Sequence, residues 1–131
     1  NIKPDIIFDS AHNTEGIINF LSEFKKDSKK YSKKVLLFGV MKDKSIEEML
    51  SALKDNFDEI NICSIDLERS CKTDELKLIA DSLEINAIPQ ENPVEFVRNF
   101  SMENKNACLV VTGSMYLLGY IKSNLHKNKI A

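Results

Sequence analysis

Three polar strings hold the residues of this chain whose types could do chemistry, and each string follows an apolar run. They are DSAHN at Asp9 to Asn13, FGVMKDKS at Phe38 to Ser45 and VTGSMYLLG at Val111 to Gly119. In an open α/β sheet the carboxyl ends of parallel strands face one crevice, so turns that are distant in sequence can meet at one ligand. The three strings therefore predict one binding site.

The first string offers a carboxylate, an imidazole and a carboxamide. Asp9 closes the first apolar run, where its carboxylate could accept hydrogen bonds from ribose hydroxyls or hold a hydrated magnesium ion. His12 and Asn13 can donate to a phosphate or carboxylate, and a helix that begins near Thr14 adds the partial positive charge of its N-terminus. One alternative stays open: Asp9 and Asn13 form a turn and a helix cap, and His12 is solvated.

The other two strings combine cations, a hydroxyl and small residues at helix starts. Lys42 and Lys44 could bind nucleotide phosphates. The alternative is that Ser45 caps a helix, that Asp43 lies near its positive end, and that the lysines are exposed. In the third string Ser114 could bind a carboxylate, and the small residues around it let a ligand approach backbone amides. The alternative there is an ordinary helix cap.

Strand-like apolar runs alternate with segments of helical period, as in successive βα units of a mostly parallel sheet. The expected strands are Asp5 to Phe8, Val35 to Phe38, Ile60 to Ile65, Ala87 to Ile88 and Ala107 to Val111. The expected helices are Thr14 to Lys26, a segment carrying Ile46 to Leu53, one starting near Thr73, one from Pro93 to about Phe100, and one carrying Leu117 to Leu125. We predict an α/β fold: a Rossmann-like three-layer αβα domain with about five or six strands and helices on both faces.

Caps and one loop can be predicted in more detail. Ser45 and Glu48 have the spacing of a capping box at a helix start. Asn92 and Pro93 suit the cap and the first position of the fourth helix. We expect the loop from Asp66 to Lys72 to be exposed.

The composition and charge limit the classes of protein to which the chain can belong. The chain has 131 residues, of which 43% are hydrophobic and 29% charged, and its formal net charge is -2. These values suit one globular domain spanning residues 1–131 and give no overall attraction to nucleic acid or anionic lipid. No apolar run approaches the roughly 20 residues of a membrane span, and no signal-peptide pattern is present, so we expect a cytoplasmic protein. Cys63, Cys71 and Cys108 lack metal-site spacing, so we expect reduced structural thiols.

The order and wording of the three strings resemble the C-terminal domain of folylpolyglutamate synthase and of the bifunctional dihydrofolate synthase, relatives of the Mur ligases. Members read Asp-Gly-Ala-His-Asn-Pro at the first string, Phe-Gly followed by Asp-Lys at the second, and Thr-Gly-Ser with an aliphatic and aromatic helix start at the third. The resemblance covers essentially the whole chain. Its departures are Ser10, where glycine is usual, and Thr14, where proline is usual. Neither departure removes a charged group.

This resemblance implies an ATP-dependent amide ligase that adds L-glutamate to folate, or to dihydropteroate, through an acyl phosphate. It implies that Asp9 and His12 are the catalytic candidates, with Asp9 against the ATP ribose and His12 between the nucleotide and the incoming glutamate. Ser114 would help to hold that glutamate. Further candidates for ATP binding are Ser10, Asn13, Lys42, Asp43 and Lys44.

No G-x-x-x-x-G-K-[ST] string occurs in the sequence. The resemblance therefore implies that the phosphate-binding loop and most magnesium ligands belong to an N-terminal ATPase domain outside this chain. The chain starts at Asn1, directly before a strand, so we expect a single C-terminal domain that is inactive alone, binds ATP weakly and is monomeric. A Mur-type ligase acting on a cell-wall precursor and a nucleotide-binding module without chemistry remain alternatives. A dinucleotide-binding dehydrogenase domain is disfavoured, because no G-x-G-x-x-G follows the first strand.

Two surface features each have a structural and a functional interpretation. A run of lysines is expected to be a solvated helix end, where the helix dipole favours cations. Its members are Lys25, Lys26, Lys29, Lys30, Lys33 and Lys34. The alternative is that these lysines attract a polyglutamate product. Tyr116 and Tyr120 lie four residues apart on the last helix, and we expect them to pack rather than to stack on bases.

Overall fold

The computed structural model describes residues 2–126 and arranges five strands in one sheet. The strands are β1 (Asp5–Phe8), β2 (Lys33–Phe38), β3 (Glu59–Ile62), β4 (Ala87–Pro89) and β5 (Ala107–Thr112). Neighbouring strands are all parallel, and their spatial order is β1-β5-β2-β3-β4. The predicted α/β class is confirmed, with every strand parallel.

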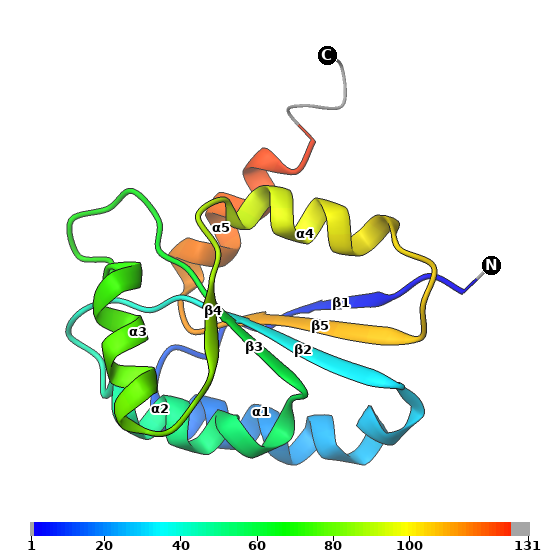
Figure 1. Cartoon of the computed structure of the whole chain (residues 1–131), viewed down its shortest axis with the longest axis horizontal. Helices are drawn as coiled ribbons and strands as arrows, with labels where there is room; N and C mark the ends of the chain where they lie inside the picture. Colours follow the sequence, from blue (N-terminus) through cyan, green and yellow to red (C-terminus); the bar gives the residue numbers. More distant parts are fainter. Residues whose placement is uncertain (1, 127–131) are drawn as a thin grey trace.

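Helices cover both faces of this sheet, as Figure 1 shows. They are α1 (Thr14–Asp27), α2 (Ile46–Leu53), α3 (Thr73–Ser82), α4 (Pro93–Met102) and α5 (Met115–Asn124), with short 3-10 turns η1 (Ser28–Lys30) and η2 (Lys54–Asn56). Alternate residues of a strand point to opposite faces. Leu36 and Val110 therefore share a core with α1, α2 and α3, whereas Leu37 and Leu109 share one with α4 and α5. The predicted three layers are confirmed.

The connection after β3 differs from the expected exposed loop. Strand β3 ends at Ile62, three residues before the predicted end. Residues 66–69 are exposed as expected, but Ser70 and Cys71 are buried. Ser70 forms an isolated antiparallel bridge with Met41, and the Cys71 amide donates to the Val40 carbonyl over 2.8 Å. The loop therefore folds back onto the turn that follows β2, where strand-like pairing satisfies its backbone groups.

One predicted cap is confirmed and the other is wrong. The Asn92 Oδ1 accepts from the Glu95 amide over 3.1 Å, and Pro93 begins α4. The capping box of Ser45 and Glu48 does not form, because the Ser45 side chain makes no cap hydrogen bond. The Glu48 Oε1 instead accepts from the Thr14 Oγ1 over 3.1 Å and so joins α2 to α1. A tertiary contact has displaced the local one.

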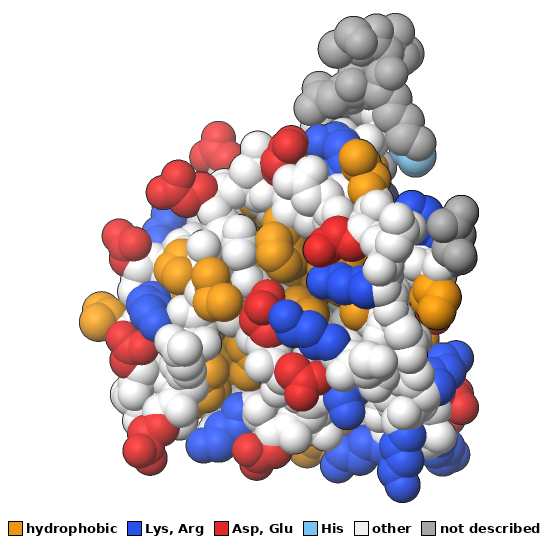
Figure 2. Space-filling view, turned by 45° about the vertical axis from the view of Figure 1, so that its right-hand side comes forward, with side chains coloured by type: hydrophobic (Ala, Val, Ile, Leu, Met, Phe, Trp, Pro, Cys, Tyr) orange, Lys and Arg blue, Asp and Glu red, His pale blue; other side chains and the backbone are white. Residues whose placement is uncertain are grey.

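Lysines gather where α1 ends and β2 begins. In Figure 2, several basic side chains, drawn in blue, lie along the bottom of the molecule. Lys25, Lys29 and Lys30 are exposed, and Lys26 pairs with Glu23 over 3.1 Å. These four lysines form the solvated helix end that we expected, whereas Lys33 and Lys34 of the same run belong to β2 and are half-buried. Helix α1 has 14 residues and is about 21 Å long at 1.5 Å per residue. The lysines at its end therefore lie far from Thr14, where the helix begins. Attraction of a polyglutamate product stays a prediction.

The two tyrosines of α5 do not pack in the core, so that expectation is wrong. Tyr116 is 51% exposed and Tyr120 is 43% exposed. The apolar stripe of α5 consists of Leu117, Leu118 and Ile121, which turn the tyrosines outward. Among the helices of residues 2–126, none has the length and apolar character needed to cross a membrane.

The three cysteines are buried free thiols. Burial raises the pKa of Cys63 to about 12 and the pKa values of Cys71 and Cys108 to about 11. Because the thiolate is the reactive form, we expect iodoacetamide at pH 8 to alkylate the native protein about 100-fold more slowly than the urea-unfolded protein. Mass spectrometry of timed, quenched samples measures both rates. Equal rates for any one cysteine would contradict this expectation.

Candidate active site

The turns after β1, β2, β3 and β5 meet around a hollow of about 200 Å³ at the carboxyl edge of the sheet. We call it the carboxyl-edge hollow. Its lining residues are His12, Met41, Asp43, Lys44, Arg69, Ser114, Met115 and Tyr116. Each of the three polar strings contributes to this lining. The structure therefore brings together side chains that are far apart in sequence, as the alternation of strands and polar turns predicted.

Backbone contacts between neighbouring strand ends hold these turns together. The Gly39 amide donates to the Thr112 carbonyl over 3.3 Å, and the Gly113 amide donates to the Ala11 carbonyl over 3.1 Å. Gly113 has a φ of 112°, a conformation that favours glycine. Because β5 lies between β1 and β2, the third string can contact both of the others.

Asp9 orders the first turn and is absent from the lining of the hollow. Its Oδ2 accepts from the Ala11 amide over 3.0 Å and from the Thr112 Oγ1 over 3.3 Å. Asp9 is half-buried and does not line the hollow. The turn interpretation of this residue is therefore what the structure shows, and its carboxylate ties β1 to β5.

Two further candidates of the first string also lie outside the hollow. The Asn13 Oδ1 accepts from the Gly16 amide over 2.8 Å and caps α1. Ser10 is exposed, and its carbonyl contacts the His12 ring. Thr14, which stands where the resembling family has proline, uses its hydroxyl to reach Glu48. The start of α1 thus forms without a proline at this position.

His12 is exposed at the rim of the hollow. Its Nδ1 lies 3.2 Å from the Ser10 carbonyl oxygen. In the tautomer with a proton on Nδ1, this nitrogen donates to Ser10, and the other ring nitrogen, Nε2, can accept a proton. The ring can therefore serve as a hydrogen-bonding group or as a base toward a molecule in the hollow.

Ser114 is 2% exposed and caps α5. Its Oγ accepts from the Tyr116 amide over 3.1 Å and from the Leu117 amide over 3.3 Å. The cap interpretation is thus correct, and it is compatible with ligand binding, because the hydroxyl proton stays free to donate while the oxygen accepts. Helices α1, α2 and α5 all begin at this edge, where their N-termini favour an anion.

The second string contributes two of its three charged residues. Lys44 and Asp43 line the hollow, whereas Lys42 does not. Within residues 2–126 neither Lys44 nor Asp43 forms an ion pair with another side chain. The Lys42 amide donates to the Arg69 carbonyl over 2.7 Å, so this lysine fixes the neighbouring loop through its backbone.

Arg69 is the charged residue of the lining that sequence reasoning missed. It belongs to the 66–72 loop, which we expected to be an exposed connection. The signal was available, because this polar loop follows β3 just as the three strings follow their strands. What the sequence did not show is the pairing of Ser70 with Met41, which carries Arg69 back to the hollow.

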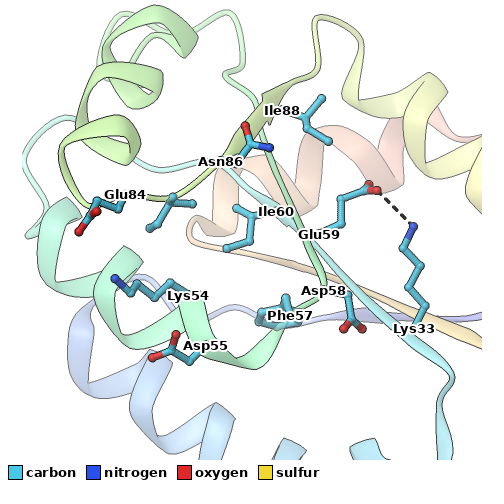
Figure 3. Close-up of a pocket in the computed structure, with 11 residues that line it drawn as sticks. Lys33, Lys54, Asp55, Phe57, Asp58, Glu59, Ile60, Glu84, Asn86 and Ile88 are labelled. Atoms are coloured by element: carbon cyan, nitrogen blue, oxygen red, sulfur yellow. Dashed lines mark hydrogen bonds and ion pairs between the residues drawn. The ribbon is translucent and has the colours of Figure 1, made fainter.

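A larger hollow, about 420 Å³, lies at the opposite, amino edge of the sheet (Figure 3). It contains none of the predicted site residues. Three of its charged groups are engaged with one another or with backbone: Lys33 pairs with Glu59 over 3.3 Å, and the Lys54 Nζ donates to the Leu83 carbonyl. Burial acts to raise the pKa of Glu59, but hydrogen bonds from Asn61 and Lys33 outweigh it and lower the pKa. This pairing occupies both lysines of that hollow, so neither is free to bind an anion.

The carboxyl-edge hollow fits an anion better than a metal ion. Lys44 and Arg69 place an ammonium and a guanidinium there, beside the N-terminus of α5. Across the described part of the chain, no group of three or more His, Cys, Asp or Glu side chains is placed to hold a metal. The donor set suits phosphate or carboxylate groups.

Comparison with known proteins gives one family match and several structural relatives. A model of the family described as Mur ligase, glutamate ligase domain, matches residues 2–115. The dihydrofolate synthase/folylpolyglutamate synthase of Bacillus subtilis (strain 168) is 29% identical over 124 residues, which are 93% of this chain and 28% of that protein.

Several solved structures share the fold. Folylpolyglutamate synthase from Thermotoga maritima superposes with a TM-score of 0.77 at 26% identity over 95% of this chain and 28% of that one. E. coli FolC in complex with ADP gives a TM-score of 0.82 at 17% identity over 100% of this chain and 31% of that one. The chain spans less than a third of the length of these relatives. The family match over nearly its whole length, together with this fold, shows that the chain belongs to the Mur ligase, glutamate ligase domain family.

Proposed function

We propose that the chain is the C-terminal domain of an ATP-dependent amide ligase that adds L-glutamate to a folate. The observation that carries this proposal is the convergence of His12, Lys44 and Ser114, from three separate strand ends, on one hollow. Relatives with this fold support it. One is a bifunctional folylpolyglutamate synthase/dihydrofolate synthase solved with Mn, AMPPNP and L-glutamate, and another is E. coli FolC solved with DHPP and ADP.

In the proposed reaction the acceptor carboxylate attacks the terminal phosphorus of ATP, and ADP leaves. The amine of L-glutamate then attacks the acyl carbon of the resulting acyl phosphate. Inorganic phosphate leaves and an amide remains, while the amine loses a proton. Such a reaction needs two anions held in position and charge stabilised, and it needs no protein nucleophile.

The residues of the hollow can supply these tasks. Lys44 and the helix N-termini offset the charge of the phosphates. The Ser114 hydroxyl donates to a glutamate carboxylate, and the His12 Nε2 accepts the proton that the amine releases. Asp9 holds the first turn through its Oδ2, and its Oδ1, which has no hydrogen-bond partner in residues 2–126, is available to the ATP ribose.

The remaining parts of the site are proposed to lie on an N-terminal ATPase domain. The phosphate-binding loop belongs there, because the sequence of this chain contains no such string. Magnesium bound with ATP neutralises phosphate charge, and its ligands are proposed on that domain. Closure of the two domains would exclude water from the acyl phosphate. The chain alone is then inactive and binds ATP weakly.

Product analysis of the complete enzyme tests this function. The chain joined to its N-terminal domain is supplied with ATP, L-glutamate and either a folate or dihydropteroate. We expect one glutamate to be joined to the acceptor for each ADP formed, as measured by liquid chromatography and mass spectrometry. The matched reaction replaces the folate with a nucleotide-linked cell-wall peptide precursor. If the enzyme used that precursor and neither the folate nor dihydropteroate, the folate assignment would be overturned in favour of a Mur-type ligase.

A further inference from the structure

The first and second polar strings are each tied to the third string by backbone hydrogen bonds, but not to each other. The Gly113 amide donates to the first string, and the Gly39 amide of the second string donates to the third. Strands β1 and β2, which precede the first and second strings, are separated by β5 and do not pair. Backbone pairing therefore sets the position of His12 relative to Lys44 only indirectly, through β5.

One side-chain contact joins the two turns directly. The Thr14 Oγ1 donates to the Glu48 Oε1 over 3.1 Å. Thr14 is the first residue of α1 and comes two residues after His12. Glu48 lies in the first turn of α2, four residues after Lys44. Within residues 2–126 no other hydrogen bond and no ion pair joins α1 to α2.

This contact adds direction to the packing of the two helices. Helices α1 and α2 cover the same face of the sheet (Figure 1), and Ile17 of α1 and Met49 of α2 are fully buried in one core. Apolar burial is non-directional, whereas a hydrogen bond weakens steeply away from its preferred distance and angle. The bond of Thr14 to Glu48 is therefore a directional restraint at the helix ends that lie next to the hollow.

The contact is a feature of this chain. Thr14 stands where the resembling family usually has proline, and proline has neither a hydroxyl nor an N–H with which to donate to Glu48. Glu48 has no role in capping its own helix, because the Ser45 side chain forms no cap hydrogen bond. Its carboxylate is thus available to α1.

We propose that the bond of Thr14 to Glu48 positions the first string against the second across the carboxyl-edge hollow. It thereby holds His12 and Lys44, which both line the hollow, in place relative to each other. The consequence for catalysis rests on the proposed function. There His12 accepts a proton from the attacking amine while Lys44 offsets phosphate charge, so one transition state needs both. Displacing one from the other slows the chemical step more than it weakens the binding of either substrate.

A double-mutant cycle in the complete enzyme tests this positioning pair. Thr14→Val keeps the shape of the side chain without its hydroxyl, and Glu48→Ala removes the acceptor. We expect each variant to lower kcat about 3- to 10-fold, the factor of one hydrogen bond, with smaller changes in the KM for ATP and for L-glutamate. The double variant should be no slower than the slower single variant, because both substitutions remove the same contact. Thr14→Ser, which keeps the hydroxyl, should restore kcat.

Glu47 provides the matched control. It is exposed in the first turn of α2, beside Glu48, and within residues 2–126 it forms no ion pair. Glu47→Ala removes the same charge near the same helix N-terminus and should leave kcat unchanged. Urea unfolding of all these variants measures stability. Additive effects on kcat, or coupling of Thr14 with Glu48 in the free energy of unfolding but not in kcat, would overturn the proposal.

NMR of this chain tests the pair without any ligase activity. Thr14→Val should shift the amide signal of Lys44, although the two residues belong to different turns. Glu48→Ala should likewise shift the amide signal of His12, and Glu47→Ala should not. These shifts in a protein that joins no glutamate to folate would uphold the pair and overturn the folate ligase. Their absence from a working folate ligase would overturn the pair alone.

Discussion

Replacing His12 with alanine in the complete enzyme should lower ligase turnover about 100- to 10,000-fold, the usual contribution of a positioned acid or base. The ring is exposed, and its one hydrogen bond, to the Ser10 carbonyl, is local. Its removal therefore leaves no cavity and no buried unpaired group, so the fold should stay intact. Initial rates of ADP release at saturating ATP and glutamate measure the effect, and circular dichroism checks the fold.

His126 provides the matched control for this substitution. It is the other histidine of the sequence, it is exposed, and it lies outside the carboxyl-edge hollow. His126→Ala should keep the turnover of the unmutated enzyme. If His12→Ala retained more than about a tenth of the original rate, the ring would be a minor contact and the proton would have to leave by another route.

Replacing Gly113 with alanine should destabilise the domain by about 3 kcal/mol or more. Gly113 has a φ of 112°, which an L side chain rarely adopts. A Cβ there would collide with the Gly39 carbonyl oxygen and lie 2.9 Å from the Phe38 ring. Relief would require moving the end of β2, and this would also separate the turns that carry Asp43 and Ser114. Urea unfolding of the chain, followed by circular dichroism, measures the change.

Gly119→Ala is the matched control for Gly113→Ala. It lies in α5 with an ordinary backbone conformation, and a Cβ there would meet nothing within 4 Å. Gly119→Ala should stabilise the domain by about 0.5 to 1 kcal/mol, because alanine loses less conformational entropy in a helix. A Gly113→Ala variant as stable as Gly119→Ala would show that the junction of β2 and β5 is more pliable than its contacts indicate.

Much of the fold could be predicted from local patterns in the sequence. Strand β1 has the predicted bounds, and β5 was recognised as a buried central strand from its continuous apolar run. The Asn92 cap was predictable because its partner, the Glu95 amide, lies three residues away. Caps and periodicities of this kind depend on neighbours within a turn or two of the chain.

The features that sequence analysis predicted wrongly depend on contacts between distant segments. Glu48 was expected to cap its own helix, but Thr14 from α1 takes its carboxylate. Tyr116 was expected to pack, but its position on α5 turns it outward beside Arg69. In both cases a partner far away in sequence decides where the side chain lies.

The sequence by itself determined the class of the fold and the edge of the sheet at which polar side chains would gather, because strand and helix periods and the order of apolar runs are local properties. Only the tertiary structure decided which of those side chains share the hollow. It separated Asp43 and Lys44 from Lys42, left Asp9 and Asn13 outside the lining, where their side chains bind backbone amides, and brought Arg69 in. The physical reason is that the membership of a site follows from strand order and loop pairing, such as the bridge of Met41 with Ser70, and these join segments that no local pattern connects.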